Sequence, residues 1–419
     1  MGTRFAAILA VMMVAGCGGY GAEAFTCDNA AQCPTGGACQ PNGSCSQLDP
    51  SCTESGQRYT DHSGSLSGTC VGQQTGSGSD ASIDVPIDAQ LCFGNAPFAI
   101  CLAAAPTAPL PISSTMTINT DTSSMCVATT SGGANYCVVA ATSIAITAKL
   151  RGVGSKPLVL IAADSITVST TSGQIDVASH RGDPDRGAGA NPTVCVAGTP
   201  PGTRAGGAGG SFTGKGGKGG NAAGGGTGGQ AADGTTSITT LRGGCAGQDG
   251  DGGGKGVGGR GGGAVYLIAG NRIDIGGSGI DAAGEGGSQG TPNAGASSGA
   301  GGGGAGGMIG FDALTITCNT LILANGGGGG EGSGEATPGG TGSDPSETDP
   351  APGGSGNQIG GNGGPGSSGT AAGPGGDASN GSSAGGSDGG GGGGGGAAGL
   401  IRVPVGATLG TLVSPPATP

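Results

Sequence analysis

The chain has 419 residues, of which 106 are glycine and only 2% are aromatic, and it contains no tryptophan. These few large apolar side chains cannot fill a conventional core along the whole chain. Disulfides, or close backbone packing between glycine segments, must therefore help to hold the fold. The net charge of −12 and the pI near 4.4, without a basic patch among aromatic residues, argue against nucleic-acid binding.

The first residues have the features of an export signal. Residues 1–16 join a positive start to an apolar stretch too short to span a membrane, and the "VAGC" at 14–17 has the pattern of a bacterial lipobox. We therefore predict a signal peptide over 1–16, lipidation of Cys17, and a lipidated tether over 17–26 that binds the membrane. The alternative is ordinary cleavage at the "AEA" of 22–24, which would release a soluble protein. Both predict export, and the first predicts a cell-envelope location, at the outer membrane or the cell surface.

A cysteine-rich module is predicted over 27–73. An exported chain with closely spaced cysteines predicts disulfides, here among Cys27, Cys33, Cys39, Cys45, Cys52 and Cys70, but the sequence leaves their connectivity open. A zinc site is the alternative, disfavoured because the module has no CxxC pair and only His62 nearby. Residues 74–90 are rich in Ser, Gly and Asp and predict a flexible acidic linker.

Segments that alternate β-branched and polar residues follow from residue 91 and predict strands. Residues 158–179 match residues 265–284, and similar units occur at 308–326 and, more loosely, at 400–413. Each unit contains about three short strands, which suits one coil of a solenoid in which stacked coils bury each other's apolar side chains. The fold class predicted for 91–419 is thus mainly β, an irregular parallel β-helix, with a β-sandwich as the alternative.

The alternation within one of these repeats predicts which of its side chains face the core. In 265–284 the inward set is Val265, Leu267, Ile273 and Ile275, and the outward residues are Arg272 and Asp274.

Long glycine-rich inserts separate these units, at about 185–260, 284–307 and 325–398. Their glycines fall in near triplets, which matches the three-residue period of a polyproline-II-type helix. We predict polyglycine-II-like bundles, with disordered linkers as the alternative.

The remaining cysteines lie within 91–419. Neighbour pairing would join them as Cys92–Cys101, Cys126–Cys137 and Cys195–Cys245. Cys318 is then left over in a predicted strand, where a buried free thiol is expected.

Motif matches in this glycine-rich sequence lack the context that their chemistry requires. The calcium-type "GGSGID" at 276–281 is solitary, although that motif works in tandem, and the "GGSFTGK" at 209–215 is followed by glycine where a phosphate loop needs Ser or Thr. We therefore assign no catalytic, cofactor or metal residue. The RGD tripeptide at 181–183 alone is weak evidence for adhesion to a receptor.

A carbohydrate-active β-helix would need charged side chains clustered on one face of adjacent coils. The outward candidates are Asp164, Asp176, Arg272 and Asp274, and ordinary solvated residues are the plainer interpretation.

Two parts of the chain resemble known proteins. The "CDNAAQCPTGGACQPNGSCS" stretch, followed by "DPSCTESGQRY", resembles a small module of myxobacterial surface lipoproteins. The pieces "DVASHRGDP", "LRGGCAGQ", "GGGAVYLIAG" and "ANGGGGGEG" resemble glycine-rich lipoproteins of the same bacteria. The resemblance implies a cell-envelope location and, for the cysteine-rich module, a disulfide-stapled spacer near the membrane, and it adds nothing about activity. We expect a non-enzymatic envelope lipoprotein with a structural or adhesive role and no cofactor, whose partners are extracellular polysaccharide or envelope proteins. A β-helix carbohydrate-active enzyme or a polysaccharide-binding protein is the alternative.

Overall fold

The computed structural model describes residues 27–71 except 28, 34–35, 53–54, 61–62, 64–65 and 67, and residues 91–419 except 236, 347, 357–358 and 370–372. The predicted signal peptide, Cys17, the tether, the linker at 74–90 and His62 lie outside the described residues. The chain divides into two units, Met1–Val85 and Pro86–Pro419. Within the described ranges, no helix is long and apolar enough to cross a membrane.

The first unit is held by disulfides. A 3-10 helix, η1 (Ala30–Gln32), precedes an antiparallel sheet of β1 (Ala38–Cys39), β2 (Cys45–Leu48) and β3 (Gln57–Tyr59). The disulfides are Cys27–Cys39, Cys33–Cys45 and Cys52–Cys70, so every cysteine of the predicted module is paired. Among the described residues here, the buried hydrophobic side chains are all cysteines, because a unit this small has too little apolar surface for a core.

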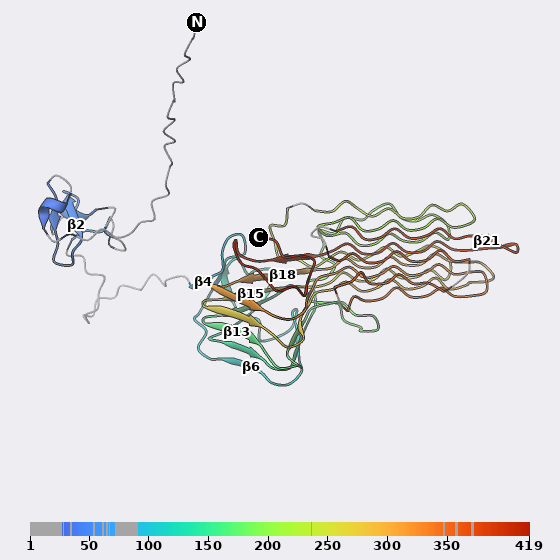
Figure 1. Ribbon diagram of the computed structural model, residues 1–419, viewed down its shortest axis with the longest axis horizontal. Coiled ribbons are helices and arrows are strands. Elements are labelled where there is room, and N and C mark those ends of the chain that lie inside the picture. Colours follow the sequence, from blue (N-terminus) through green and yellow to red (C-terminus); the bar gives the residue numbers. More distant parts are fainter. Residues whose placement is uncertain are drawn as a thin grey trace, which may run out of the picture. The chain divides into compact units, whose positions relative to one another are not determined.

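The second unit is built on three parallel sheets (Figure 1). The first sheet contains β9 (Cys137–Ala141), β12 (Leu158–Ala162), β15 (Ala264–Ala269), β18 (Met308–Asp312) and β23 (Leu400–Arg402). The second contains β6 (Leu110–Ile112), β10 (Ile144–Ile146), β13 (Ser165–Val168), β16 (Arg272–Ile275) and β19 (Thr315–Cys318). The third contains β7 (Met116–Asn119), β11 (Lys149–Val153), β14 (Gln174–Asp176), β17 (Gly279–Asp281), β20 (Ile322–Leu323) and β24 (Val413–Ser414). From β9 to β20, consecutive strands enter the first, second and third sheet in turn.

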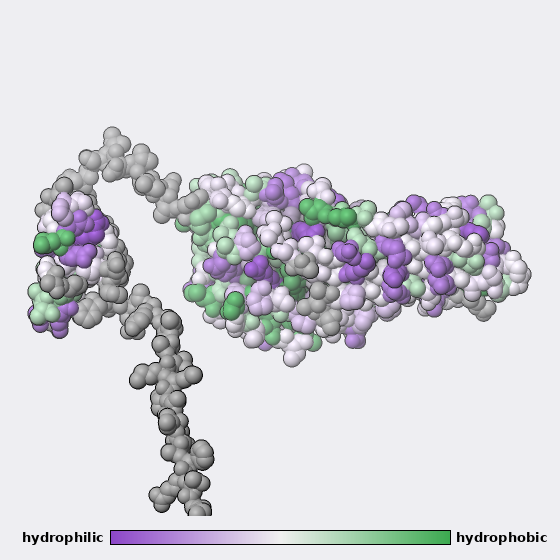
Figure 2. Space-filling model, turned by 90° about the horizontal axis from the view of Figure 1, so that it is seen from above, coloured by the Kyte–Doolittle hydropathy of each residue, from purple (hydrophilic) through white to green (hydrophobic). Residues whose placement is uncertain are grey.

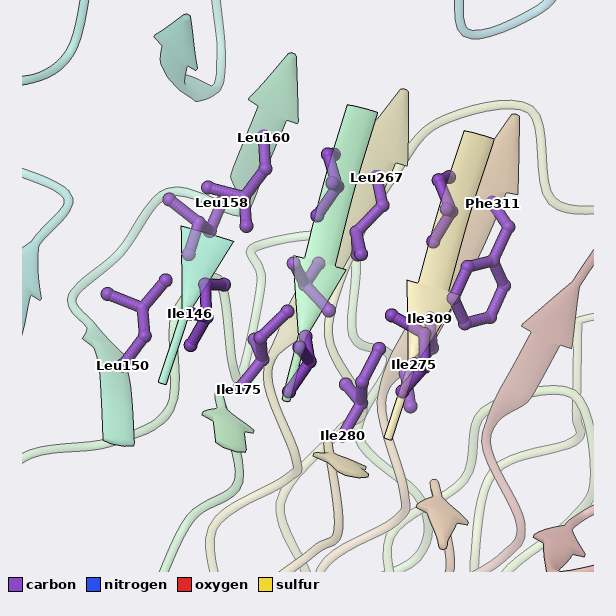
Figure 3. Close-up of a cluster of buried hydrophobic side chains, with 14 of the residues drawn as sticks. Ile146, Leu150, Leu158, Leu160, Ile175, Leu267, Ile275, Ile280, Ile309 and Phe311 are labelled. Atoms are coloured by element: carbon purple, nitrogen blue, oxygen red, sulfur yellow. The ribbon is translucent and has the colours of Figure 1, made fainter. Parts of the chain in front are cut away.

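Strand pairing follows the repeat seen in the sequence. Leu158 lies beside Val265 and Leu160 beside Leu267 in the first sheet, and Ile166 lies beside Ile273 in the second. Rows of aliphatic side chains from successive sequence repeats therefore meet in one core (Figure 3).

The predicted inward set, Val265, Leu267, Ile273 and Ile275, is buried in this core, as expected. The side chain of Arg272 is 58% exposed and that of Asp274 is 36% exposed, which fits their predicted outward orientation.

The first sheet is covered on both faces. Val159, Ile161, Tyr266 and Ile268 point away from the main core into a second cluster, which includes Phe98 and Phe212. Phe98 belongs to a segment with a small antiparallel sheet of β4 (Leu91–Phe93), β5 (Ile100–Leu102) and β8 (Thr129–Ser131). Burial on both faces explains why β12 and β15 are almost continuously apolar instead of alternating.

Glycine-rich segments fill the connections from β14 to β15, β17 to β18 and β20 to β23, close to the predicted inserts. They run side by side away from the sheets (Figure 1), and the last contains a small hairpin of β21 (Ser383–Ala384) and β22 (Ser387–Asp388). Their backbones are hydrogen-bonded to each other: Gly301 donates to Ser288, Gly304 to Glu285 and Gly307 to Ala282, a partner at every third residue. The described parts of these segments are therefore ordered rather than loose linkers.

Glycine is required at 301–304 because backbone atoms of several neighbouring segments lie too close for any side chain. A Cβ on Gly301 or Gly304 would lie 2.1 or 2.0 Å from the carbonyl oxygen of Val257 or Arg260. A Cβ on Gly302 would meet Ala208 O at 2.1 Å, and one on Gly303 would meet Gly327 O at 2.0 Å. Successive positions thus face three different segments, and no side chain fits between them. On the face shown in Figure 2, the outer part of these segments is mostly pale to purple, and green patches lie over the sheets and where the segments begin.

Candidate functional site

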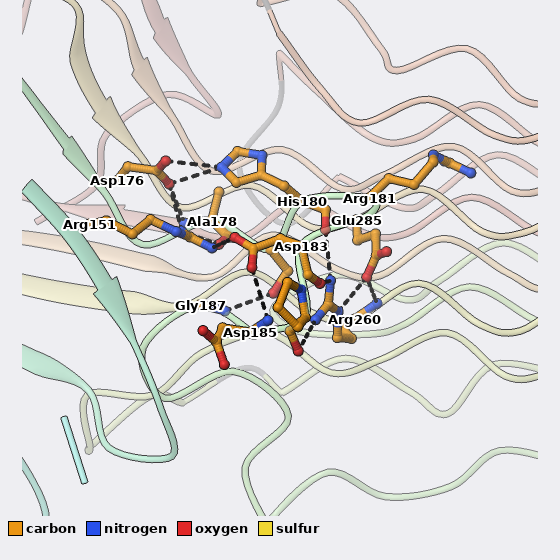
Figure 4. A network of polar contacts seen from close by, with 12 residues as sticks. Arg151, Asp176, Ala178, His180, Arg181, Asp183, Asp185, Gly187, Arg260 and Glu285 are labelled. Carbon is orange, nitrogen blue, oxygen red and sulfur yellow. Dashed lines mark hydrogen bonds and ion pairs between the residues drawn. The ribbon is translucent and has the colours of Figure 1, made fainter. Parts of the chain in front are cut away.

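Charged side chains collect at the end of the third sheet, where glycine segments begin. Arg151 of β11 lies beside Asp176 of β14, and Asp176 lies beside Asp281 of β17. Because neighbouring residues of parallel strands in register point to the same face, these three side chains form a ladder across the strands. With Lys149 and His180 they make what we call the junction cluster. Figure 4 shows three of its members, Arg151, Asp176 and His180.

Asp176 is the centre of this cluster. The prediction that its side chain is an outward, solvated one is wrong. Its side chain is 0% exposed and its carboxylate is 2.9 Å from Arg151 Nη1, 2.5 Å from Lys149 Nζ and 3.0 Å from His180 Nε2. The chain turns at the end of β14, where Ala178 N donates to the same carboxylate, and the following loop covers it. Burial opposes ionisation, but the His180 hydrogen bond and the positive charges of Arg151 and Lys149 outweigh it and hold the pKa of Asp176 well below its usual range.

Two arginines fasten the loop at 177–187 that follows Asp176. Arg151 also donates to Ala178 O at 2.6 Å and to Asp183 at 3.1 Å. Arg260 donates to Glu285 at 2.6 Å and to the carbonyls of His180 and Asp183, both at 2.7 Å. Carbonyls outside a sheet need such donors when they are buried, so these arginines replace the missing ladder bonds.

The RGD tripeptide lies in the same loop. Arg181 donates to Gly342 O and its backbone N–H donates to Asp344 at 2.8 Å, while Asp183 pairs with Arg151. Its charged side chains are therefore engaged within the fold.

Asp281 and His180 are the two groups of the cluster whose pKa values are raised. Burial and the neighbouring charge of Asp176 raise the pKa of Asp281 to about 6. The hydrogen bond to Asp176 raises the pKa of His180 against the effect of burial. Two carboxyls with opposite shifts beside an imidazole are an arrangement found in acid–base sites.

A metal ion is a poor fit to the same groups. Asp176, His180 and Asp281 can each offer one atom within 4.8 Å of the others. However, Arg151 and Lys149 already neutralise Asp176 and would repel a cation.

The other outward candidates lie on a different sheet. Asp164 is exposed just before β13 and accepts from Asn271 Nδ2 at 3.0 Å, and Arg272 and Asp274 of β16 form an ion pair at 3.4 Å. The structure therefore does not bring them together with Asp176. Asp281 was missed as a candidate, although matching "QID" at 174–176 with "GID" at 279–281 already places it next to Asp176.

The cysteines of this unit pair as neighbours. The disulfides are Cys92–Cys101, Cys126–Cys137 and Cys195–Cys245, the pairs proposed from sequence order. Cys318 is a buried free thiol whose pKa is raised by burial, as expected for a structural cysteine.

Comparison with protein-family models, curated proteins and solved structures finds no match to this chain.

Proposed function

We propose that the protein is a non-enzymatic lipoprotein of the cell envelope with a structural or adhesive surface role. The observation that carries the proposal is the set of glycine segments between β14 and β23, whose backbones bond to one another at every third residue. Such segments offer few side chains for chemistry but can extend a stiff surface away from the sheets.

We further interpret the three sheets as turns of an irregular parallel β-helix and the glycine segments as polyglycine-II-like helices. Parallel pairing of successive units in register supports the first interpretation. The three neighbours faced by successive glycines at 301–304 support the second, because a helix with three residues per turn points each residue of a turn in a different direction.

In this proposal Cys17 carries the lipid, the disulfide module at 27–73 and the acidic linker at 74–90 act as spacers, and the remainder faces the exterior. Cys17→Ser tests the anchor: we expect the protein to leave the membrane fraction, and unchanged fractionation would contradict it. A binding and turnover screen on extracellular polysaccharides tests the role. We expect binding without turnover, and measurable turnover would refute the non-enzymatic role.

The junction cluster favours a second candidate, a carbohydrate-active enzyme. Asp281, with its raised pKa, would act as the acid, ionised Asp176 as the second carboxylate, and Arg151 as a charged neighbour. If the screen finds turnover, Asp281→Asn must abolish it while Asp274→Asn leaves it unchanged. Equal activity of the two variants would remove this candidate.

A further inference from the structure

A cavity of about 490 Å³ has none of the junction-cluster residues in its lining, and we call it the arginine cavity. Its walls include Tyr136, Arg186, Asn191, Val194, Leu241 and Arg242. The disulfide Cys195–Cys245 joins the chain just after Val194 to the chain just after Arg242, so it fastens two walls together. This volume falls within the range of small-molecule sites.

The cavity is positively lined in a strongly acidic protein. Two arginines line it, and none of its described lining residues is acidic, although the whole chain has a net charge of −12. Ser155 of the lining donates to the carboxylate of Asp121, from its backbone N–H at 2.8 Å and from its hydroxyl. The charges of Lys156 and Arg186 add to those hydrogen bonds in lowering the pKa of Asp121.

Arg242 is buried without a carboxylate. The residue is 8% exposed, its guanidinium lies 4.7 Å from the centre of the Phe212 ring, and Nη2 donates to Thr235 Oγ1 at 3.2 Å. No acidic group in the described part of the chain forms an ion pair with Arg242 or Arg186. Buried arginines are normally paired, so this one has charge available for an anion.

Neutral donors and apolar groups complete the lining. Tyr136 Oη accepts from Leu241 N at 3.3 Å, and no described group accepts the hydroxyl proton. Asn191 Oδ1 accepts from Gly261 N at 2.8 Å, which directs the amide NH₂ the other way. The Tyr136 ring, Val194 and Leu241 add apolar surface beside these polar groups.

We infer that the arginine cavity binds a carboxylate-bearing sugar, either a free uronic acid or a uronate unit of an acidic polysaccharide. Guanidinium groups pair with carboxylates through two hydrogen bonds, which a lysine or a neutral donor cannot reproduce. The Tyr136 ring and aliphatic side chains suit the face of a sugar ring, and the amide and hydroxyl donors suit its hydroxyls. Only one part of this inference rests on the proposed adhesive role, namely that the sugar belongs to a polysaccharide.

Calorimetric titration of the full-length chain tests the site with glucuronate, galacturonate, glucose and inorganic phosphate. We expect both uronates to bind at least about tenfold more tightly than glucose, and more weakly as salt rises. No uronate binding up to about 10 mM, or equal binding of glucose, would overturn the inference. Phosphate that binds as tightly as the uronates would refute the sugar and leave a general anion site.

Matched arginine variants locate the binding. Arg186→Gln should weaken uronate binding by about tenfold, the effect of losing one charge-assisted contact. Arg272→Gln, with the same change of net charge on an exposed side chain of the second sheet, should have no effect. Equal effects of the two variants would refute the site. Arg242→Lys keeps the charge but loses the fork geometry, so it should also weaken binding while the melting temperature stays close to that of the wild type.

Binding of acidic polysaccharide separates this inference from the proposed function. Free uronates that bind while polysaccharides do not would keep the cavity and reject the adhesive role. Polysaccharides that bind wild type and Arg186→Gln equally would keep the adhesive role and reject the cavity.

Discussion

Gly303→Ala tests whether close packing of backbones holds the glycine segments together. The new Cβ would lie 2.0 Å from Gly327 O, 2.6 Å from Gly327 C and 2.8 Å from Gly328 O. Gly303 is held on both sides, because its N–H donates to Gly394 O at 2.9 Å and its carbonyl accepts from Gly210 N at 2.8 Å. The methyl group therefore has to push segments apart and cannot rotate away.

The expected loss follows from opposing terms. Alanine reduces the entropy of the unfolded chain, which stabilises by about 0.4–1 kcal/mol. Overpacking in a closely packed region costs about 1–3 kcal/mol, and an overlap of more than about 1 Å with backbone atoms belongs at the upper end. We expect a net loss of about 2 kcal/mol, confined mainly to opening of the glycine segments.

The suitable assay is hydrogen exchange measured by mass spectrometry, because it reports local opening. The peptides to follow are those from 282–307 and 324–399. Gly276→Ala is the control, since its Cβ would meet only Val168 O, at 3.2 Å. We expect exchange in Gly303→Ala to rise about 30-fold, the factor for about 2 kcal/mol, and exchange in the control to stay near wild type. Equal protection in the two variants would show that backbone contact does not hold the segments.

Three further predictions concern the junction cluster and the disulfide beside the arginine cavity. Asp281 has a pKa of about 6 in the fold against its usual 3.8. Its contribution to the stability of the fold is therefore fully present below pH 3.8 and is lost as pH rises to 6. In urea titrations, the free energy of unfolding should therefore fall by about 1–2 kcal/mol between about pH 4 and 6, and Asp281→Asn should reduce that fall; an unchanged profile would contradict the assignment. Arg151→Ala leaves Asp176 buried with less compensation and should cost about 3–5 kcal/mol in the same assay, whereas Arg272→Ala should cost less than about 1 kcal/mol. Replacing both Cys195 and Cys245 by serine should cost about 2–4 kcal/mol and weaken uronate binding, and unchanged binding would mean that the disulfide does not shape the cavity.

The strands were predictable because their signal is local. The matched segments 158–179 and 265–284 correspond to β12 to β14 and β15 to β17, and the match places Ile166 beside Ile273. The limits of the glycine inserts could be predicted for the same reason, since each begins where apolar alternation ends.

The junction cluster could not be predicted in full because it depends on the path of a loop. Asp176 follows the alternation of a solvated position, and only the turn after β14 brings His180 back over it. Arg151 carries no local mark that distinguishes a ligand of a buried carboxylate from an exposed arginine. The partners of the glycine segments were equally hidden, because glycine has no side chain whose pattern could indicate which of three neighbours it faces.

The glycine segments depend on the sheets for their stability. Each ordered residue loses about 1–2 kcal/mol of backbone entropy, whereas a backbone hydrogen bond contributes about 1 kcal/mol net, so isolated glycine segments would not stay folded. The sheets supply what is missing: the segments start and end at strands, and Phe212 of the longest insert packs with Val159, Ile161 and Tyr266. With their ends fixed, the segments lose less entropy on ordering, because closing the loops has already restricted them. The sheets should therefore fold without the glycine bonds, whereas the glycine segments should not order without the sheets. Deleting residues 283–306 should leave the main core able to form and should raise exchange throughout 324–399, whose segments bond to the deleted one.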